Sequence, residues 1–161
     1  MVGYVIGLGD RHGDNILFHQ HTGEISHVDF DCIFEKGLKL KVPEIVPFRL
    51  TRNIVDCFGL FKEKGTFTRT SEIVLRVLKK NHRNINSFLE TFLHDPLIET
   101  SSSSKVSIDD ALKLVKKKLK GTDNAADEVA ITVEEQVEQQ IMKAMNDDYL
   151  KRMYIGWMPW L

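Results

Sequence analysis

Three polar residues near the start of the chain have the types and the spacing that metal-dependent phosphoryl transfer requires. Asp10 and Asn15 lie five positions apart, and Asp29 follows downstream in an Asp-Phe pair. In this chemistry one carboxylate orients the attacking hydroxyl group, while amide and carboxylate oxygens hold magnesium. The pattern therefore predicts Asp10 as a catalytic carboxylate, and Asn15 and Asp29 as ligands of the metal ion that accompanies a nucleotide.

The residues between Asp10 and Asn15 are expected to support this site. His12 would lie near the transferring phosphoryl group as a second catalytic residue, either donating a hydrogen bond to it or relaying a proton, and the sequence leaves both roles open. Arg11 is expected to brace the loop rather than to contact substrate, and Asp14 is expected to face solvent.

A β-hairpin is predicted to bring the two metal ligands together. Asn15–Phe18 and Ile25–Val28 are short apolar runs on either side of a polar segment that contains a glycine, which is typical of a hairpin. Such a hairpin places Asn15 at the start of one strand and Asp29 just past the end of the other. Residues 30–51 contain two prolines and no sustained periodicity, so a long ordered loop is expected there.

Periodic apolar residues further along predict helices that act as scaffold. A short helix is expected from Thr51 to Phe58, and Thr70 or Ser71 is expected to cap a second helix. A third helix would end at Asp95-Pro96, and its aromatic residues are expected to lie in the core. The apolar stripes of the second and third helices are Ile73, Val74, Val77 and Leu78, and Ile85, Phe88, Leu89 and Phe92.

Two capped helices and an aromatic ending are predicted after the Thr-Ser run at residues 100–104. A helix beginning after Ser107 would end at Gly121, and a capping box from Thr132 to Glu135 would begin the next helix. The first helix carries lysines at positions 113, 116, 117, 118 and 120, interpreted as a solvated face rather than a nucleic-acid or phosphoinositide patch.

The ending, Tyr149–Leu161, is too apolar to remain in water. It contains two Trp, two Tyr and two Met, and large apolar side chains are each stabilised by about 1.5–3 kcal/mol on burial. The segment is therefore expected to dock against the rest of the chain, against a partner or at a membrane surface.

Composition limits the class of protein. The 161 residues allow about one domain, 42% hydrophobic residues can form a core, and a net charge of −1 gives no sign of a nucleic-acid surface. Cys32 and Cys57 are expected to be reduced thiols of a soluble intracellular protein. The histidines between positions 19 and 27 lack zinc-ligand spacing with Cys32, so no zinc site is predicted. The apolar start, Met1–Ile6, is too short to span a membrane.

Three segments resemble the PI-3-kinase-related protein kinases. Gly7–Phe18 has that family's order of Asp-Arg-His before the asparagine, Pro43–Thr51 looks like the end of its activation segment, and Tyr154–Leu161 looks like its FATC tail. The resemblance implies a mainly α fold with a small β-hairpin, in which the C-terminal lobe of a PI3/PI4-kinase-like fold precedes a helical FATC tail. It implies a partial catalytic domain at 1–99, a linker or regulatory segment at 100–130 and FATC at 131–161. The tail would then dock near the activation segment.

Within that family, the segment His27–Gly37 looks most like the ATR-type checkpoint kinases, although Asp31 stands where kinases often have glycine. This likeness implies transfer of the ATP γ-phosphate, with Mg²⁺ or Mn²⁺, to Ser or Thr before Gln. It also implies a nuclear role in DNA-damage and replication-stress signalling, a regulatory partner subunit, only indirect contact with DNA, and no membrane association.

Other interpretations stay open. A TOR-type kinase shares the Tyr-Ile-Gly-Trp tail, and a lipid kinase shares the Asp-Arg-His loop. A noncatalytic fragment is the third, because a kinase also needs a phosphate-covering loop and a lysine for the α- and β-phosphates. Neither feature occurs in these 161 residues, so we expect that they do not turn over ATP alone.

Overall fold

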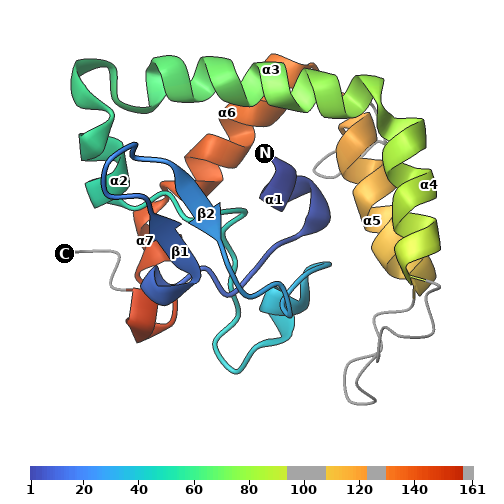
Figure 1. Ribbon diagram of the computed structural model, residues 1–161, viewed down its shortest axis with the longest axis horizontal. Helices are drawn as coiled ribbons and strands as arrows, with labels where there is room; N and C mark the ends of the chain where they lie inside the picture. Colours follow the sequence, from blue (N-terminus) through green and yellow to red (C-terminus); the bar gives the residue numbers. More distant parts are fainter. Residues whose placement is uncertain (94–107, 123–129, 158–161) are drawn as a thin grey trace.

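The computed structural model describes residues 1–93, 108–122 and 130–157. Within them the chain is mainly helical with one small antiparallel hairpin, as predicted (Figure 1). The α-helices are α1 (Val2–Ile6), α2 (Arg52–Cys57), α3 (Thr66–Lys80), α4 (His82–Leu93), α5 (Ile108–Lys120), α6 (Val133–Ala144) and α7 (Asp147–Leu150). Short 3-10 helices are η1 (Gly13–Asn15), η2 (Lys36–Lys39), η3 (Gly59–Lys64) and η4 (Ile155–Trp157).

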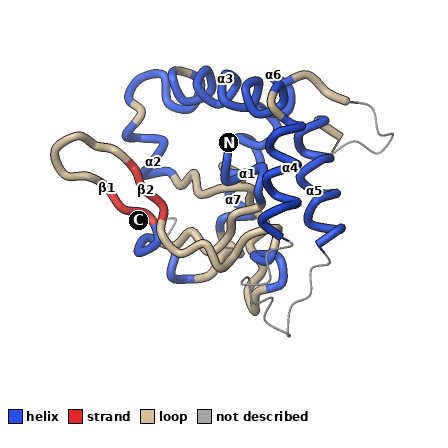
Figure 2. Tube along the Cα trace, turned by 45° about the vertical axis from the view of Figure 1, so that its right-hand side comes forward, coloured by secondary structure: helices blue, strands red, loops and turns tan. Residues whose placement is uncertain are grey.

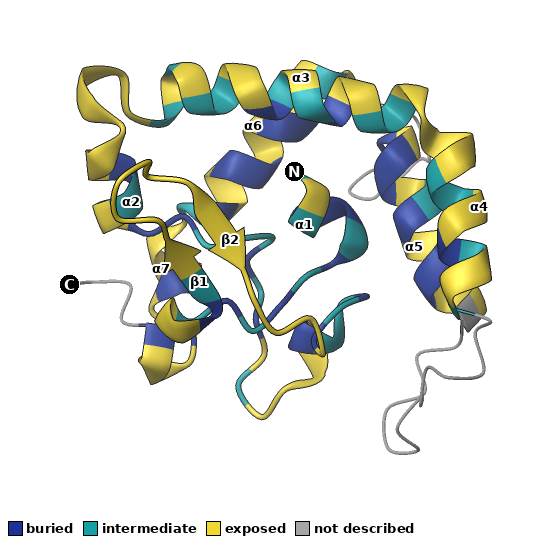
Figure 3. Cartoon of the chain, in the orientation of Figure 1, coloured by how far each residue is buried: buried dark blue, intermediate teal, exposed yellow. Residues whose placement is uncertain are grey.

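The hairpin pairs β1 (Ile16–Phe18) with β2 (Ile25–His27). Ile16 faces His27 in the register, so the next pair outward is Asn15 and Val28. The backbone N–H of Val28 donates to the carbonyl of Asn15 at 3.2 Å. The ribbon protrudes from the helices, and most of its residues are exposed (Figures 2 and 3). The predicted hairpin is confirmed. Asp29 directly follows Val28, the residue that lies opposite Asn15.

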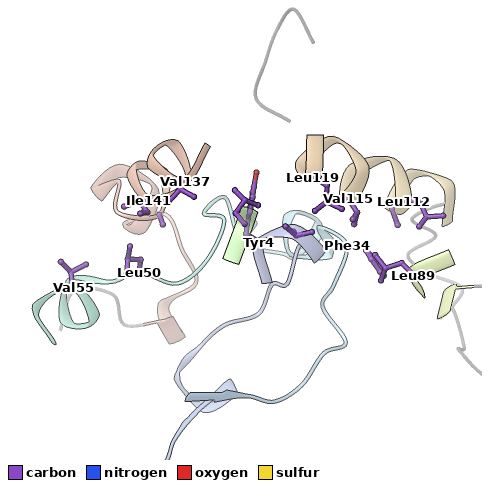
Figure 4. Packing of buried hydrophobic residues seen from close by; sticks show 14 residues of the cluster. Tyr4, Phe34, Leu50, Val55, Leu89, Leu112, Val115, Leu119, Val137 and Ile141 are labelled. Carbon is purple, nitrogen blue, oxygen red and sulfur yellow. The ribbon is translucent and has the colours of Figure 1, made fainter. Parts of the chain in front are cut away.

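The main core forms where the helices converge on α1. Figure 4 shows Tyr4 of α1 and Phe34 between Val137 of α6 and Leu119 of α5. Phe34 belongs to the long segment between the hairpin and α2, and it is only 6% exposed. The predicted loop is thus fixed to the core by its own aromatic side chain.

Helix α3 begins four residues before the predicted cap. Its first residue is Thr66, its N-cap position is Gly65, and Ser71 lies buried within it. In the first turn of this helix, the ring of Phe67 stacks on that of Phe58 with centroids 5.0 Å apart. The prediction of a cap at Thr70 or Ser71 was wrong, since both residues lie inside the helix.

Helix α4 buries only part of its apolar stripe. Leu89 is 8% exposed, whereas Phe88 and Phe92 are 69% and 43% exposed and stack on each other with centroids 6.3 Å apart. The expectation that these aromatic residues lie in the core was wrong for both phenylalanines. The helix presses a single side against α5 and α3, and the period of a helix alone does not say how wide its buried side is.

Helix α5 is amphipathic, but one of its lysines is buried. Lys113, Lys117 and Lys120 are exposed, whereas Lys118 is 7% exposed. The Lys118 ammonium donates to the Tyr4 carbonyl at 2.8 Å, pairs with Glu35 and lies 5.0 Å from the centroid of the Tyr4 ring. A fully solvated lysine face was therefore wrong, because α5 packs on α1 along this edge.

The end of the chain folds back as a second small core. The capping box is confirmed, with the Glu135 backbone N–H donating to Thr132 and the Thr132 N–H donating to the Glu135 carboxylate. Beyond α6, the buried residues Leu150, Met153 and Trp157 gather around Val46 of the predicted activation segment. The prediction that this ending docks near that segment is confirmed.

Some predictions fall outside the described residues. These are the stop at Asp95-Pro96, the Thr-Ser run at 100–104, the cap at Ser107 and the last four residues, 158–161. Along the parts of the chain that are described, none of the helices combines the length and the apolar character needed to cross a bilayer.

Candidate functional site

The catalytic loop candidate is closed by the side chain of Asn15. This residue is 7% exposed, and its Nδ2 donates to the backbone carbonyl of Asp10 at 2.8 Å. Because the amide nitrogen is committed inside the loop, the amide oxygen on the other side of the same group is the atom that can bind a cation. Asp10 and Asn15 are thus directly linked by this hydrogen bond.

Arg11 joins this loop to the end of the hairpin opposite its turn, where Asn15 and Val28 lie. The side chain is 3% exposed, and its guanidinium donates to the carbonyls of Gly9 at 2.7 Å, of Asn15 at 3.3 Å and of Val28 at 2.8 Å, and also to the carbonyl of Asp29. The fixed fork of donors in arginine suits four acceptors around one point. The expectation that Arg11 braces the loop is confirmed.

Both candidate acidic residues have left-handed backbone conformations. Asp10 has φ 58° and Asp29 has φ 59°, a region that costs energy for residues other than glycine and that is often found at functional sites. A carboxylate oxygen of Asp29 accepts the backbone N–H of Asp31 at 3.2 Å, which sets the direction of the side chain. Each carboxylate is presented by a turn that the surrounding structure holds in place.

His12 lies against Asp10. Its Nε2 is 3.9 Å from Oδ1 of Asp10, and its Nδ1 is 3.9 Å from Oδ2 of Asp14. The Asp14 side chain is fully exposed, as expected. The imidazole is therefore near enough to Asp10 to act on the same substrate group after a small rotation, which is compatible with either role that the sequence left open.

Glu44 belongs to the site but was missed in the sequence. It is 8% exposed; Oε2 accepts the backbone N–H of Asp10 at 2.6 Å, and Oε1 accepts the indole N–H of Trp157 at 3.0 Å. Burial raises the pKa of Glu44, and these two hydrogen bonds oppose that rise. A single acidic residue between apolar neighbours, as in Val42–Val46, was the signal that could have pointed to it.

The same environment affects Cys32. Burial, reinforced by the negative charges of Glu44 and Asp10, raises the pKa of the Cys32 thiol to about 11. The carbonyl of Cys32 accepts the backbone N–H of Gly9 at 2.7 Å. Cys32 is thus a neutral packing residue beneath the loop, whereas Cys57 on α2 is exposed.

The donor set fits a hard cation. Asn15 offers an amide oxygen and Asp29 a carboxylate, which are the ligands that magnesium and manganese prefer, and two protein oxygens leave positions for phosphates and water. Beside them, a pocket of about 910 Å³ opens between α1, the hairpin and α2. Its lining is mainly apolar, with Ile16, Phe18, Ile25, Phe48 and Phe67, and also includes Arg11.

Comparisons with known proteins identify the family of the chain. The family model described as Phosphatidylinositol 3- and 4-kinase matches residues 1–102, and the FATC domain model matches residues 130–161. The chain is 48% identical to the serine/threonine-protein kinase MEC1 of Kluyveromyces lactis, over 99% of this chain and 7% of that protein. It is 47% identical to protein kinase rad3 of Schizosaccharomyces pombe, over 98% of this chain and 7% of that protein.

A plant relative and a solved structure extend the likeness. The serine/threonine-protein kinase ATR of Arabidopsis thaliana is 44% identical over 99% of this chain and 6% of its own length. The structure of the FAT and kinase domain of CtTel1 superimposes with a TM-score of 0.88 at 39% identity, covering 99% of this chain and 11% of that one. The chain thus spans 6 or 7% of the length of these curated relatives. It belongs to the PI-3-kinase-related protein kinases and consists of part of their kinase domain followed by a FATC domain.

Proposed function

We propose that this chain supplies the catalytic and metal-binding half of a serine/threonine protein kinase site, transferring the γ-phosphate of ATP to a protein hydroxyl. The observation that carries the proposal is the link between the two acidic turns. Arg11 binds the carbonyls of Asn15 and Asp29 at once, and Asn15 binds the carbonyl of Asp10. A catalytic carboxylate and two oxygen ligands are thereby held on one rigid frame, which supports phosphoryl transfer by positioning.

Each residue has a separate role in this proposal. Asp10 accepts a hydrogen bond from the substrate hydroxyl and takes its proton as the oxygen attacks. Asn15 and Asp29 would hold Mg²⁺ or Mn²⁺, which when bound neutralises the developing charge on the phosphates. His12, beside Asp10, donates a hydrogen bond toward the transferring group or relays its proton.

The finer assignment follows the likeness to the checkpoint branch. Relatives named as serine/threonine-protein kinases support Ser and Thr as acceptors. The ATR-like segment His27–Gly37 supports a preference for Ser or Thr before Gln, a nuclear role in DNA-damage and replication-stress signalling, a regulatory subunit, and only indirect contact with DNA. We also propose the division into a partial kinase domain at 1–99, a linker or regulatory segment at 100–130 and FATC at 131–161.

A chimaeric kinase tests the activity. The matching C-terminal residues of the MEC1 relative would be replaced by this chain, and phosphorylation of a Ser-Gln peptide would be compared with that of phosphatidylinositol vesicles. We expect peptide phosphorylation that depends on Mg²⁺ or Mn²⁺ and that falls roughly a thousandfold in Asp10→Asn. Asp56→Asn, an exposed carboxylate on α2, is the matched control and should leave the rate unchanged. Activity of Asp10→Asn within about tenfold of the parent would contradict the assignment.

The isolated chain gives a second test. We expect that the 161 residues, titrated with Mg-ATP, show no phosphotransfer. Kinases need a loop that covers the phosphates and a lysine that pairs with the α- and β-phosphates, and this sequence contains neither. Turnover by the isolated chain would refute this part of the proposal.

A further inference from the structure

The docked tail reaches the candidate catalytic loop through two side chains of the activation segment. Trp157 is 2% exposed; its indole N–H donates to Glu44, and its backbone carbonyl accepts from Arg49 at 2.5 Å. Glu44 in turn accepts the N–H of Asp10 at 2.6 Å, and Arg49 donates to the carbonyl of Arg11 at 3.4 Å. We call Glu44, Arg49 and Trp157 the tail clamp.

The carboxylate of Glu44 is tightly packed against the backbones of Gly9 and Gly37. A Cβ added at Gly9 would lie 2.8 Å from Oε2 of Glu44, and one added at Gly37 would lie 3.0 Å from the same oxygen. The backbone N–H of Glu44 also donates to the carbonyl of Gly37 at 3.0 Å. The carboxylate is therefore pinned between two backbones, so any displacement of Glu44 moves the Asp10 peptide.

We propose that Glu44 is a positioning residue through which docking of the tail at Trp157 fixes the backbone, and hence the carboxylate direction, of Asp10. The proposal rests on the proposed role of Asp10 and adds the residue that controls it. A carboxylate can accept both N–H groups at once, one on each oxygen, without a proton of its own. Arg49 adds a second link of opposite charge between the same tail residue and the next loop residue, and its guanidinium lies 5.3 Å from the centroid of the Trp157 ring.

The conformation of Asp10 explains why such a residue is needed. At φ 58° the Asp10 backbone is in a region that a non-glycine residue leaves unless contacts hold it there. The Asp10 N–H donates to Glu44 and the Asp10 carbonyl accepts from Asn15, so contacts hold the residue on both sides. Loss of either one releases the direction of the carboxylate.

The test uses the chimaeric kinase with Glu44→Gln, Trp157→Phe and the double variant. A glutamine offers one acceptor and one NH₂ group, so Glu44→Gln sets a donor against the N–H of either Asp10 or Trp157. We expect kcat to fall roughly ten- to a hundredfold, with KM for ATP changed by less than about twofold. Trp157→Phe keeps an aromatic ring at this buried position but removes the five-membered ring of the indole together with its N–H donor. In that background Glu44→Gln can turn its oxygen to Asp10, so the double variant should be little worse than Trp157→Phe alone.

A readout without catalysis separates positioning from activity. In the 161-residue chain, Trp157→Phe should shift the amide NMR resonance of Asp10, because the indole N–H and the Asp10 N–H share the Glu44 carboxylate. Glu138→Gln on the exposed face of α6 should leave that resonance in place. An unshifted Asp10 resonance, or a kcat of Glu44→Gln within about twofold of the parent, would overturn the inference. If Glu44→Gln does not fold, Trp157→Phe provides the same two readouts. Unimpaired activity of Asp10→Asn would instead remove the proposed function itself.

Discussion

The hydroxyl of Tyr4 accepts a 2.9 Å hydrogen bond from the side-chain amide of Gln136, which lies 132 residues further along the chain. Gln136 is fully buried and also donates to the carbonyl of Lys118 at 2.8 Å. The helix that opens the chain is thus joined to the FATC helix α6 and to α5 by one amide group.

Removing this amide should destabilise the fold. Gln136→Leu keeps the size of the side chain but removes the amide that donates to the Tyr4 hydroxyl and to the Lys118 carbonyl. Because the Lys118 carbonyl still accepts the backbone N–H of Gly121 at 3.2 Å, we expect a loss of about 1–3 kcal/mol in the free energy of unfolding. Urea denaturation followed by circular dichroism measures this loss. The neighbouring exposed residue provides the control, since Gln139→Leu should change stability by less than about 0.5 kcal/mol. Equal midpoints for the two variants would show that the bond is dispensable.

Lys118 should behave differently from the other lysines of α5. Lys118→Met removes the ammonium that bonds to the Tyr4 carbonyl and to Glu35, whose side chain is 30% exposed. Losing hydrogen bonds to a charged group costs about 1.5–3 kcal/mol. Lys117→Met, one position away and exposed, should cost less than about 0.5 kcal/mol. The comparison again uses urea unfolding, and a loss shared by both variants would point to helix propensity instead of the ion pair.

Arg11 cannot be replaced by the other basic residue. Arg11→Lys keeps the charge but offers one compact donor group to four carbonyls spread around the guanidinium. We expect about 2–3 kcal/mol lower stability and loss of most phosphotransfer in the chimaeric kinase. Arg83→Lys on the exposed surface of α4 is the matched change. Full activity of Arg11→Lys would show that phosphotransfer does not depend on the four hydrogen bonds of the guanidinium.

The two cysteines should differ in reactivity. The thiolate is the reactive form, and burial together with Glu44 raises the pKa of Cys32 to about 11, while Cys57 is exposed. Iodoacetamide near neutral pH should therefore modify Cys57 in the folded chain and Cys32 only after unfolding. Peptide mapping by mass spectrometry measures the two sites, and rapid labelling of Cys32 in the folded state would be inconsistent with its burial.

The buried carboxylate makes a signed prediction about pH. Burial raises the pKa of Glu44 above its ordinary value of 4.5, so just above that pH the folded protein retains a proton that the unfolded chain has released. The contribution of this group to stability is fully present below pH 4.5 and is lost as pH rises through the raised pKa. The wild-type free energy of unfolding, minus that of Glu44→Gln, should accordingly decrease from pH 4.5 upward. Urea titrations across that interval check the slope, and a difference that grows with pH would contradict the assigned direction.

The sequence by itself determined the features that depend on near neighbours along the chain. The hairpin, the position of Asp29 just past its second strand and the capping box at Thr132 all follow from spacings of a few residues or one tight turn. The apolar composition of the ending predicted that it packs against another surface. The family resemblance predicted that this surface lies near the activation segment, where Val46 contacts it.

Only the tertiary structure decided which distant groups meet. The Glu44 carboxylate accepts hydrogen bonds from Asp10, 34 residues away in the sequence, and from Trp157, 113 residues away. No periodicity or short motif predicts such a pairing. The burial of Lys118, the exposure of Phe88 and Phe92, and the earlier start of α3 have the same origin. Periodicity shows that a helix has an apolar side, but the fraction that becomes buried depends on the shape of the partner that packs against it.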